Sequence, residues 1–467
     1  MPEKKTTALL RRLRNNVLRR ITPTPAERRA EQRMADHLLR QIRSIRGVHI
    51  GAVWAGSSAR DTHIKNDRDL DIFVQFPHHL SREVFEREGL ALGKAIFKGH
   101  DFEQAYSEHP YIRGQIEGFD IEIVPSFAVA DASQKKSAVD RSVFHHAFVQ
   151  KNLKTGQHAD VRLLKAFLKG IKAYGAETAT EAVPGYLTEL LILRYGSFEK
   201  TVAAMASWNP PVLIDIAGSW NPPAALTQFN QNHLIVIDPV DANRNVAAAL
   251  SLDQFARIIA ASRALLQKPS MDFFFPRAEK PLTSSRLKSL LSHKNALVWS
   301  YPFPAGQLAD IAWGQARRLR RKLVAQLASH GFGVRRSGEF TDEKNVVAIW
   351  VDLETVSLAP TMRQEGPTIW DEKNATAFLA RHRAVESGPR LENGRIVIEK
   401  KRAFDNAPEL VARLLNEFSN GEKNPLAKSL KRSSVHWGIA SLSLARKKPS
   451  LALAFSQFLM GREPFLE

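Results

Sequence analysis

Apolar residues recur at helical spacing near the start of the chain and alternate with polar residues in the segments that follow. Met34, Leu38 and Ile42 predict a helix over residues 27–46. A second helix is predicted over residues 81–97, with Ser81 at its N-cap. Strands are predicted at residues 48–55, 70–76 and 119–124. A helix before a small mixed sheet predicts an α/β catalytic head of roughly 150 residues.

The pattern beyond this head is first mainly helical and then mixed. Helical spacing extends over residues 159–266 and is broken by two Trp-Asn-Pro-Pro stretches, at 208–211 and 220–223. A second α+β region is predicted from a helix at 310–329, a strand at 346–352 and an Asn-Gly hairpin at 391–395. Residues 408–465 are predicted to be helical and basic. The expected fold is α+β and multidomain, divided at 1–152, 153–266 and 267–467.

Length and composition fit this division. A chain of 467 residues is too long for one hydrophobic core, and two to four domains are expected. The longest apolar run, at residues 187–193, is interrupted by Glu189 and falls short of the ~18 residues of a membrane span. The chain has no cysteine, which excludes disulfides and thiolate metal sites and agrees with a reducing cytoplasm. A soluble cytoplasmic protein without a membrane partner is expected.

The charge of the chain is strongly positive. Lys and Arg number 67 against 48 Asp and Glu, which gives a net charge of +19. Residues 1–46 hold thirteen Lys or Arg and four Asp or Glu, and a second basic cluster lies at 317–322. Either cluster alone is most often a solvated helix face. The total excess favours at least one surface that binds nucleic-acid phosphates, and RNA-backbone contact is slightly favoured for 317–322.

Two strands carry carboxylates in alternation with apolar residues. Asp69 and Asp71 share one strand face, and Asp120 and Glu122 share a face of another strand. If these strands are neighbours, three carboxylates could hold two metal ions about 4 Å apart, as used for in-line phosphoryl displacement. The alternative is an edge strand with one wet face. The upstream Gly56-Ser57 turn, followed by Arg60, favours the metal site because such a turn offers N–H groups and a hydroxyl to a triphosphate.

This arrangement resembles the polymerase-beta-type nucleotidyltransferase superfamily, and within it the archaeal-type, class I CCA-adding enzymes, over nearly the whole length. The turn and the Asp-x-Asp strand are shared by the superfamily. The more specific matches are Ser-Ala-Val-Asp-Arg-Ser-Val-Phe-His-His at 137–146, Val-Arg-Leu-Leu-Lys at 161–165, Tyr-Gly-Ala-Glu at 174–177, Gly-Tyr-Leu at 185–187, Asp-Pro-Val-Asp at 238–241, Arg-Asn-Val-Ala at 244–247 and Ser-Val-His-Trp at 434–437.

The resemblance implies template-independent addition and repair of the 3′-terminal CCA of tRNA from CTP and ATP, with two Mg²⁺ ions. It implies metal ligation and catalysis by Asp69, Asp71 and Glu122, where the family commonly has Glu, Asp and Asp. NTP contacts are implied for Gly56, Ser57, Arg60, Ser142 (commonly Thr), His145, Lys165, Tyr174 and Arg244, the last reading the base edge. It also implies a nucleotidyltransferase head at 1–152, a base-recognising helical neck at 153–266, and a body and tail at 267–467 that bind the tRNA acceptor arm, with the tail at 296–405.

Other assignments of these residues stay open at the level of sequence. His145 could fill a polar gap, Lys165 could lie on the surface and Tyr174 in a core. Arg244 could be the ion-pair partner of Asp238 or Asp241. The alternative functions are another template-independent RNA nucleotidyltransferase, of poly(A) polymerase or oligoadenylate type, and an RNA-binding protein with an inactive transferase head. The oligomeric state is open, with a homodimer among the options.

Overall fold

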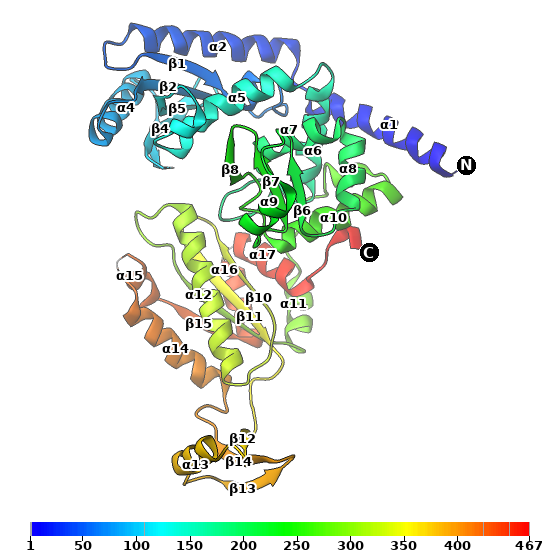
Figure 1. Cartoon of the computed structure of the whole chain (residues 1–467), viewed down its shortest axis with the longest axis vertical. Helices are drawn as coiled ribbons and strands as arrows, with labels where there is room; N and C mark the ends of the chain where they lie inside the picture. The colour runs from blue at the N-terminus through cyan, green and yellow to red at the C-terminus, as the bar shows by residue number, and fades with distance from the viewer. Residues whose placement is uncertain (1, 107, 424, 448, 467) are drawn as a thin grey trace. The chain divides into compact units, whose positions relative to one another are not determined.

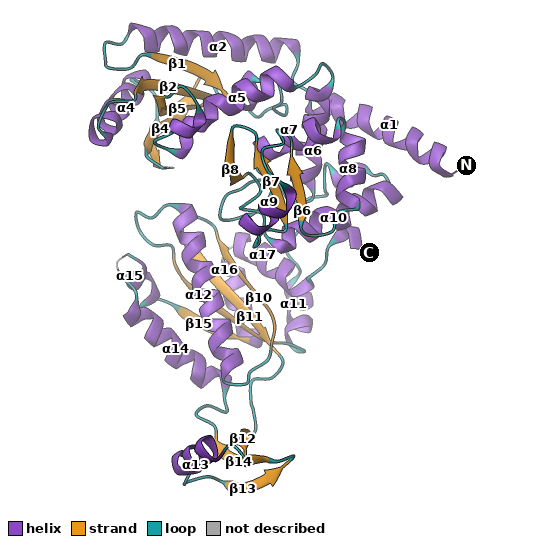
Figure 2. Cartoon of the chain, in the orientation of Figure 1, coloured by secondary structure: helices purple, strands orange, loops and turns teal. Residues whose placement is uncertain are grey.

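The computed structural model describes residues 2–106, 108–423, 425–447 and 449–466. The chain divides into two compact units, residues 1–277 with 463–467, and residues 278–462 (Figure 1). Within the described residues, no helix is both long and apolar enough to cross a membrane. The mixture of helices and strands in both units confirms the predicted α+β class (Figure 2).

The head in the first unit is a five-stranded sheet with the order β1-β2-β5-β4-β3. The strands are β1 (Gly51–Ala55), β2 (Asp69–Pro77), β3 (Phe102–Tyr106), β4 (Pro110–Ile116) and β5 (Phe119–Ala128). The helices are α2 (Pro25–Ser44), α3 (Gly56–Ala59), α4 (Arg82–Ile96) and α5 (Arg141–Asn152). The strands β2 and β5 are parallel, and the apolar faces of α2 and α4 share a buried core with the Leu and Ile side chains of β2 and β5. Ser81 caps α4 by accepting from Val84 N, as predicted.

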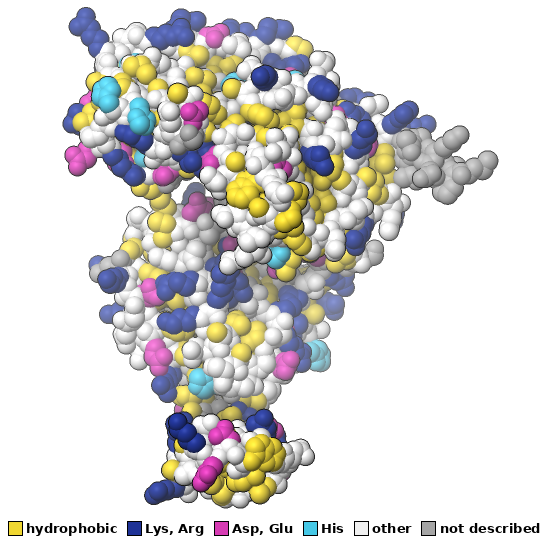
Figure 3. Space-filling view, in the orientation of Figure 1, with side chains coloured by type: hydrophobic (Ala, Val, Ile, Leu, Met, Phe, Trp, Pro, Cys, Tyr) yellow, Lys and Arg dark blue, Asp and Glu magenta, His cyan; other side chains and the backbone are white. Residues whose placement is uncertain are grey.

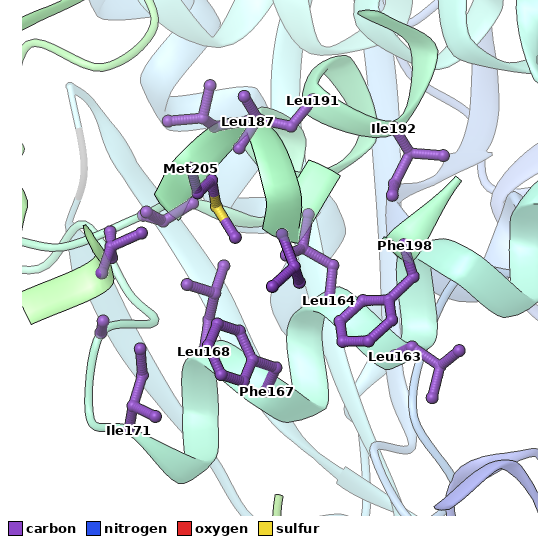
Figure 4. Close-up of a cluster of buried hydrophobic side chains, with 14 of the residues drawn as sticks. Leu163, Leu164, Phe167, Leu168, Ile171, Leu187, Leu191, Ile192, Phe198 and Met205 are labelled. Carbon is purple, nitrogen blue, oxygen red and sulfur yellow. The ribbon is translucent and has the colours of Figure 1, made fainter. Parts of the chain in front are cut away.

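The neck in the same unit is a helical bundle with a small sheet. Its helices are α1 (Pro2–Ile21), α6 (Gln157–Gly170), α7 (Gly185–Tyr195), α8 (Phe198–Ala206), α9 (Pro222–Gln228) and α10 (Leu252–Gln267). The strands β6 (Val212–Asp215), β7 (Leu234–Asp238) and β8 (Asp241–Asn245) pair in that order. Figure 4 shows part of the neck core, where Leu164 and Phe167 of α6 lie near Leu187 and Leu191 of α7.

The N-terminal helix α1 differs from the prediction that residues 1–152 form the head. Its apolar residues Leu13, Val17 and Ile21 belong to the neck core, whereas α2 belongs to the head. The helical spacing marks the apolar side of α1 but does not say which core that side joins. The last residues of the chain also return to the neck, because Phe465 packs against its core and Glu463 pairs with Arg257 at 2.5 Å.

The second unit contains a four-stranded sheet of order β10-β11-β9-β15. Its strands are β9 (Asn295–Pro302), β10 (Val334–Thr341), β11 (Val346–Leu353) and β15 (Ser434–Trp437). The helices of this unit are α11 (Ser284–Leu291), α12 (Ala309–Ser329), α14 (Ala407–Gly421), α15 (Leu426–Leu430), α16 (Leu442–Lys447) and α17 (Pro449–Met460). The helices α12 and α14 share the main core with β9 and β11. The prediction of a wholly helical 408–465 segment is wrong at β15, which pairs with β9.

A separate three-stranded sheet lies between β11 and α14 in the chain. It consists of β12 (Thr361–Thr368), β13 (Ser387–Glu392) and β14 (Arg395–Lys401), with α13 (Glu372–Arg381) beside it. The Asn-Gly turn is confirmed, because Asn393 and Gly394 join β13 to β14 with φ of 50° and 74°. The predicted tail at 296–405 therefore combines this small unit with strands β9 to β11 of the larger sheet. Local patterns predicted β11 and the turn between β13 and β14, but neither the other strands nor the sheet that each one joins.

Candidate active site

The two carboxylate-bearing strands are direct neighbours. In the parallel pairing of β2 with β5, Asp69 is opposite Asp120 and Asp71 is opposite Glu122. Side chains at paired positions of parallel strands point to the same face, so all four carboxylates lie on one side of the sheet. Leu70 lies between Asp69 and Asp71, and Ile121 lies between Asp120 and Glu122. Both apolar side chains point to the other side of the sheet, into the head core.

Asp71 has neither an ion pair nor a side-chain hydrogen bond within the described part of the chain, although it is half-buried. Burial, the charge of Glu122 and the charge of Asp69 raise the pKa of Asp71 to about 7. The positive charges of Arg60 and Lys165 act in the opposite direction, which means that both cations lie close enough to influence this carboxylate. The ionised form of Asp71 is therefore destabilised by its acidic neighbours, and an added cation would stabilise it.

Glu122 has a partner that the sequence did not identify. The Tyr111 hydroxyl on β4 donates to Glu122 Oε1 at 3.4 Å, and Arg113 is opposite Glu122 in the pairing of β4 with β5. Burial raises the pKa of Glu122, while Arg113 and the Tyr111 hydrogen bond act against that rise. Alternation along β4 could have indicated that Tyr111 and Arg113 share a face, but not that this face is the carboxylate one.

The Gly-Ser turn follows β1, the strand on the other side of β2. Gly56 has φ of +74°, and a Cβ atom built there would lie 1.9 Å from Asp71 Oδ2. Only glycine allows this backbone to pass so close to the carboxylate. The turn leads into the short helix α3, which presents the half-buried Ser57 one residue later. The structure thus brings the predicted phosphate-binding turn next to the predicted metal ligand.

Arg60 lies just after this turn but is held by a residue of the neck. Its Nε donates to Glu189 Oε1 at 3.0 Å, and its second terminal nitrogen lies 3.0 Å from Glu189 Oε2. The Arg60 side chain is 9 % exposed and that of Glu189 is fully buried. Thr62 Oγ1 donates to the same Glu189 Oε1 at 2.6 Å. In the sequence, Glu189 stands out only as the charge that interrupts an apolar run.

Lys165 and Tyr174 come from α6 and the loop after it. Lys165 is buried, and no hydrogen bond or ion pair joins its side-chain ammonium group to another described residue. Burial lowers the pKa of Lys165 to about 8, and Glu189 opposes this decrease. Tyr174 is half-buried, and its pKa is raised by burial and by the acidic residues near it. A Cβ atom on Gly185 would lie 3.0 Å from the Tyr174 hydroxyl, so the glycine allows α7 to begin beside that group.

The fully buried Asp238 at the end of β7 connects several of the remaining predicted residues. Its Oδ2 lies 2.8 Å from His145 Nε2 and 2.9 Å from a terminal nitrogen of Arg244. Its Oδ1 accepts from the Tyr186 hydroxyl at 3.3 Å and from the Val240 N–H at 3.1 Å. Burial lowers the pKa of His145, and Asp238 opposes that decrease. The alternative that Arg244 pairs with Asp238 is confirmed.

The pairing with Asp238 leaves part of the Arg244 side chain exposed to solvent. Its side chain is 32 % exposed although one terminal nitrogen is bound to Asp238. The Tyr186 ring stacks on His145 with the centroids 4.0 Å apart. Ser142 is half-buried in the first turn of α5, next to Arg141, which pairs with Asp241 of β8 at 2.8 Å. These contacts join the start of α5 to the sheet of the neck.

The donor set suits divalent cations that phosphate oxygens also bind. Among the described residues, no three Asp, Glu, His or Cys side chains converge into a complete metal site. Mg²⁺ commonly uses only one or two protein carboxylates and completes its octahedral shell with water and substrate phosphates. Asp71 and Glu122, opposite each other with Asp69 on the same face, provide oxygen ligands of this kind. These carboxylates therefore suit Mg²⁺, whose remaining coordination positions water or phosphate oxygens can fill.

Most basic side chains of the α12 cluster at 317–322, in the second unit, make contacts within that unit. Arg317 and Arg320 both pair with Glu339, and Arg318 pairs with Glu422 at 2.8 Å. The Lys322 ammonium lies 4.7 Å from the centre of the Phe418 ring. These contacts favour a structural role for most of the cluster over RNA contact. Lys and Arg side chains are also visible on the surface of both units in Figure 3.

The sheet, the turn and the carboxylates together define a nucleotidyltransferase, and comparison with known proteins agrees. Residues 36–145 match the nucleotidyltransferase domain, residues 159–275 match the second domain of tRNA nucleotidyltransferase, and residues 298–438 match the C-terminal domain of CCA-adding enzyme.

Several CCA-adding enzymes are similar to this chain over most of its length. A CCA-adding enzyme of Methanosarcina barkeri is 35% identical over 89% of this chain and 92% of its own length. CCA-adding enzymes of Methanoregula boonei and Halobacterium salinarum are 37% and 38% identical, over 84% and 78% of this chain and 84% and 79% of their own lengths. The chain belongs to the CCA-adding enzyme family.

Proposed function

We propose that this chain adds and repairs the 3′-terminal CCA of tRNA without a nucleic-acid template, using CTP and ATP and releasing pyrophosphate. The observation that carries the proposal is the carboxylate face of β2 and β5, with Asp71 next to the Gly56 turn. The match of residues 159–275 to the second domain of tRNA nucleotidyltransferase supports tRNA as the RNA substrate.

Asp69, Asp71 and Glu122 would hold two Mg²⁺ ions together with oxygens of the NTP. Bound at this face, such ions supply Lewis-acid stabilisation of the attacking 3′-oxygen and of the pyrophosphate leaving group. Gly56 and Ser57 would offer backbone N–H groups and a hydroxyl to the triphosphate. Lys165 and Arg60 add positive charge near Asp71, which favours binding of the polyanionic nucleotide.

The residues around Asp238 would form the base and ribose side of the pocket. Arg244 would read the Watson–Crick edge of the base with the part of its guanidinium that Asp238 leaves exposed. We assign His145, Ser142 and Tyr174 to ribose and triphosphate contacts. The pairing of Arg244 with Asp238 supports the role of Arg244 in reading the base. It fixes the planar guanidinium while part of this group stays exposed.

The second unit would bind the acceptor arm of tRNA, in agreement with its match to the C-terminal domain of CCA-adding enzyme. The absence of cysteine fits a reducing cytoplasm, where we place the enzyme. Sedimentation of the purified chain with and without tRNA would distinguish a monomer from a homodimer.

The decisive experiment uses tRNA transcripts that lack CCA or that end in C or CC. Each transcript is incubated with the protein, Mg²⁺ and each labelled NTP, separately and together. We expect extension to CC with CTP alone and addition of one A when ATP is also supplied. Long A tails or extension of non-tRNA substrates would instead identify a poly(A)-type or oligoadenylate-type transferase. No incorporation, with tRNA still bound, would identify an RNA-binding protein with an inactive head.

A further inference from the structure

Glu189 is a charged residue in the middle of an otherwise apolar helix. Its neighbours on α7, Leu187, Leu190 and Leu191, are fully buried in the neck core, and so is Glu189 itself. A carboxylate in such surroundings loses its hydration and is stable only if other groups compensate its charge. The choice of glutamate at this position therefore requires an explanation from its partners.

Both partners of Glu189 come from the loop that follows the Gly-Ser turn. Arg60 approaches it with two nitrogens, each 3.0 Å from a different carboxylate oxygen, and Thr62 donates to it at 2.6 Å. The Thr62 N–H also donates to the Ser57 carbonyl at 2.9 Å. The carboxylate of the neck is thus connected by short contacts to both ends of the segment from Ser57 to Thr62.

Two cations lie near Glu189. Arg60 and the buried Lys165 are two cations, and Glu189 is the carboxylate that acts on both of them. One hydrogen bond from Arg60 Nε to Glu189 Oε1 and one ion-pair contact to Oε2 restrict the orientation of Arg60 more than a single-point contact would do. The fixed Arg60 guanidinium and the nearby Lys165 ammonium together suit a triphosphate placed beside the turn.

We propose that Glu189 is a positioning residue for the triphosphate. It does not contact the nucleotide. It fixes the Arg60 guanidinium and, through Thr62, the conformation of the turn that carries Ser57, so that the neck determines the shape of a binding loop in the head. This inference rests on the proposed function, since it presumes that an NTP binds at the turn.

The test compares CTP binding and CTP addition in Glu189→Gln with a matched control. The control is Asp160→Asn, which removes the charge of another buried neck carboxylate, the ion-pair partner of Arg14. Both variants lose a buried ion pair and should lose stability. Only Glu189→Gln should weaken CTP binding, by about 10- to 100-fold as expected for loss of a hydrogen bond to a charged group. Affinity for CMP and for tRNA should stay within about twofold, because neither depends on the triphosphate contacts.

A double-mutant cycle with Arg60→Gln separates positioning from a general loss of structure. If Glu189 acts through Arg60, then Glu189→Gln should cause little further loss of CTP affinity in the Arg60→Gln background. Thr62→Val is a milder variant for the case that Glu189→Gln does not fold. It should lower CTP affinity by about 2- to 10-fold, as expected for one neutral donor, and part of this effect should persist in the Arg60→Gln background, because Thr62 also acts on the turn that carries Ser57.

Two outcomes would overturn the inference while the proposed function stands. One is CTP addition by the wild type with a Glu189→Gln affinity no lower than that of Asp160→Asn. The other is full additivity of the Glu189 and Arg60 substitutions. A wild-type chain that binds CMP and CTP equally, or neither, would overturn the proposed function and this inference with it.

Discussion

The first unit contains two groups of carboxylates that the fold treats in opposite ways. The sheet carboxylates, Asp69, Asp71 and Glu122, lie side by side on one face, and Asp69 and Asp71 have no cationic partner among the described residues. The neck carboxylates, Glu189 and Asp238, are both fully buried, yet each receives at least three contacts from donors.

The electrostatics of the two groups differ accordingly. Burial and like-charged neighbours raise the pKa of Asp71 to about 7. Burial alone would also raise the pKa of Asp238, but His145, the Val240 N–H and Arg244 outweigh it and lower that pKa. A fold normally supplies a counter-charge to a buried carboxylate. The sheet carboxylates lack such a counter-charge among the described residues and are available to a cation from outside the chain. The neck carboxylates are neutralised by their partners and hold the other proposed binding residues in place.

The largest expected effect tests the role of the sheet carboxylates. Asp71→Asn should lower nucleotide addition by about 10³-fold or more, because Asp71 is a proposed ligand of the ions that would stabilise the transition state. Binding of tRNA, measured by filter retention, should be nearly unchanged. The control is Asp120→Asn on the same sheet face, where the carboxylate accepts from Gln115 at 2.8 Å. Substantial activity in Asp71→Asn would refute the metal site.

Glycine at position 56 provides the next test, because it gives the sheet carboxylates room. Gly56→Ala should lower kcat by about 10²-fold, since its Cβ would displace Asp71 from the position it needs. Gly156→Ala is the matched control: its φ is +91° but nothing lies within 4 Å of the added atom. Both variants should lose about 1 kcal/mol from backbone strain. Equal kinetic defects in the two would show that strain, and not the contact with Asp71, is responsible.

The two groups should also differ in how pH affects folding stability without metal. The raised pKa of Asp71 means that its ionisation destabilises the folded state as pH rises from about 4 to about 7. Asp71→Asn should therefore be more stable than wild type at pH 8, by about 1–2 kcal/mol after solvent screening, and similar to it near pH 4.

Asp238 should show the opposite dependence. Because its pKa is lowered, its stabilising contribution is present above the pKa of the unfolded state and is lost as pH falls. Asp238→Asn should be less stable than wild type at pH 8, with the difference shrinking on acidification. Thermal unfolding in EDTA between pH 4 and pH 8 would check both variants, and parallel pH profiles would contradict the comparison.

The smallest expected effect concerns Glu122, which accepts a hydrogen bond from the neutral Tyr111 hydroxyl. Tyr111→Phe removes the 3.4 Å contact to Glu122, so kcat should fall by about 2- to 10-fold with little change in KM for CTP. Tyr106→Phe on β3, where the tyrosine is 55% exposed, is the control. If both variants behave like wild type, Glu122 does not depend on Tyr111.

Much of this architecture was predictable because it is locally encoded. The alternation of acidic and apolar residues on β2 and β5 predicted which carboxylates share a face, and the structure confirms that the strands are neighbours. The Ser81 cap and the Asn393-Gly394 turn depend on backbone geometry over a few residues. The assignment of α1 and the limits of the tail were not predictable, since an apolar stripe does not identify the core it joins.

The sequence by itself predicted part of the elements, the carboxylate faces, the family resemblance and the glycine at the turn. The tertiary structure alone decided which distant charges meet. Arg60 and Glu189 are 129 residues apart, and His145 and Asp238 are 93 apart. The reason is physical: strand alternation and capping act over a few residues, whereas the partner of a buried charge is set by packing of the whole unit. In the sequence Glu189 was only a charge that interrupts an apolar run, and the fold alone identified Arg60 as its partner.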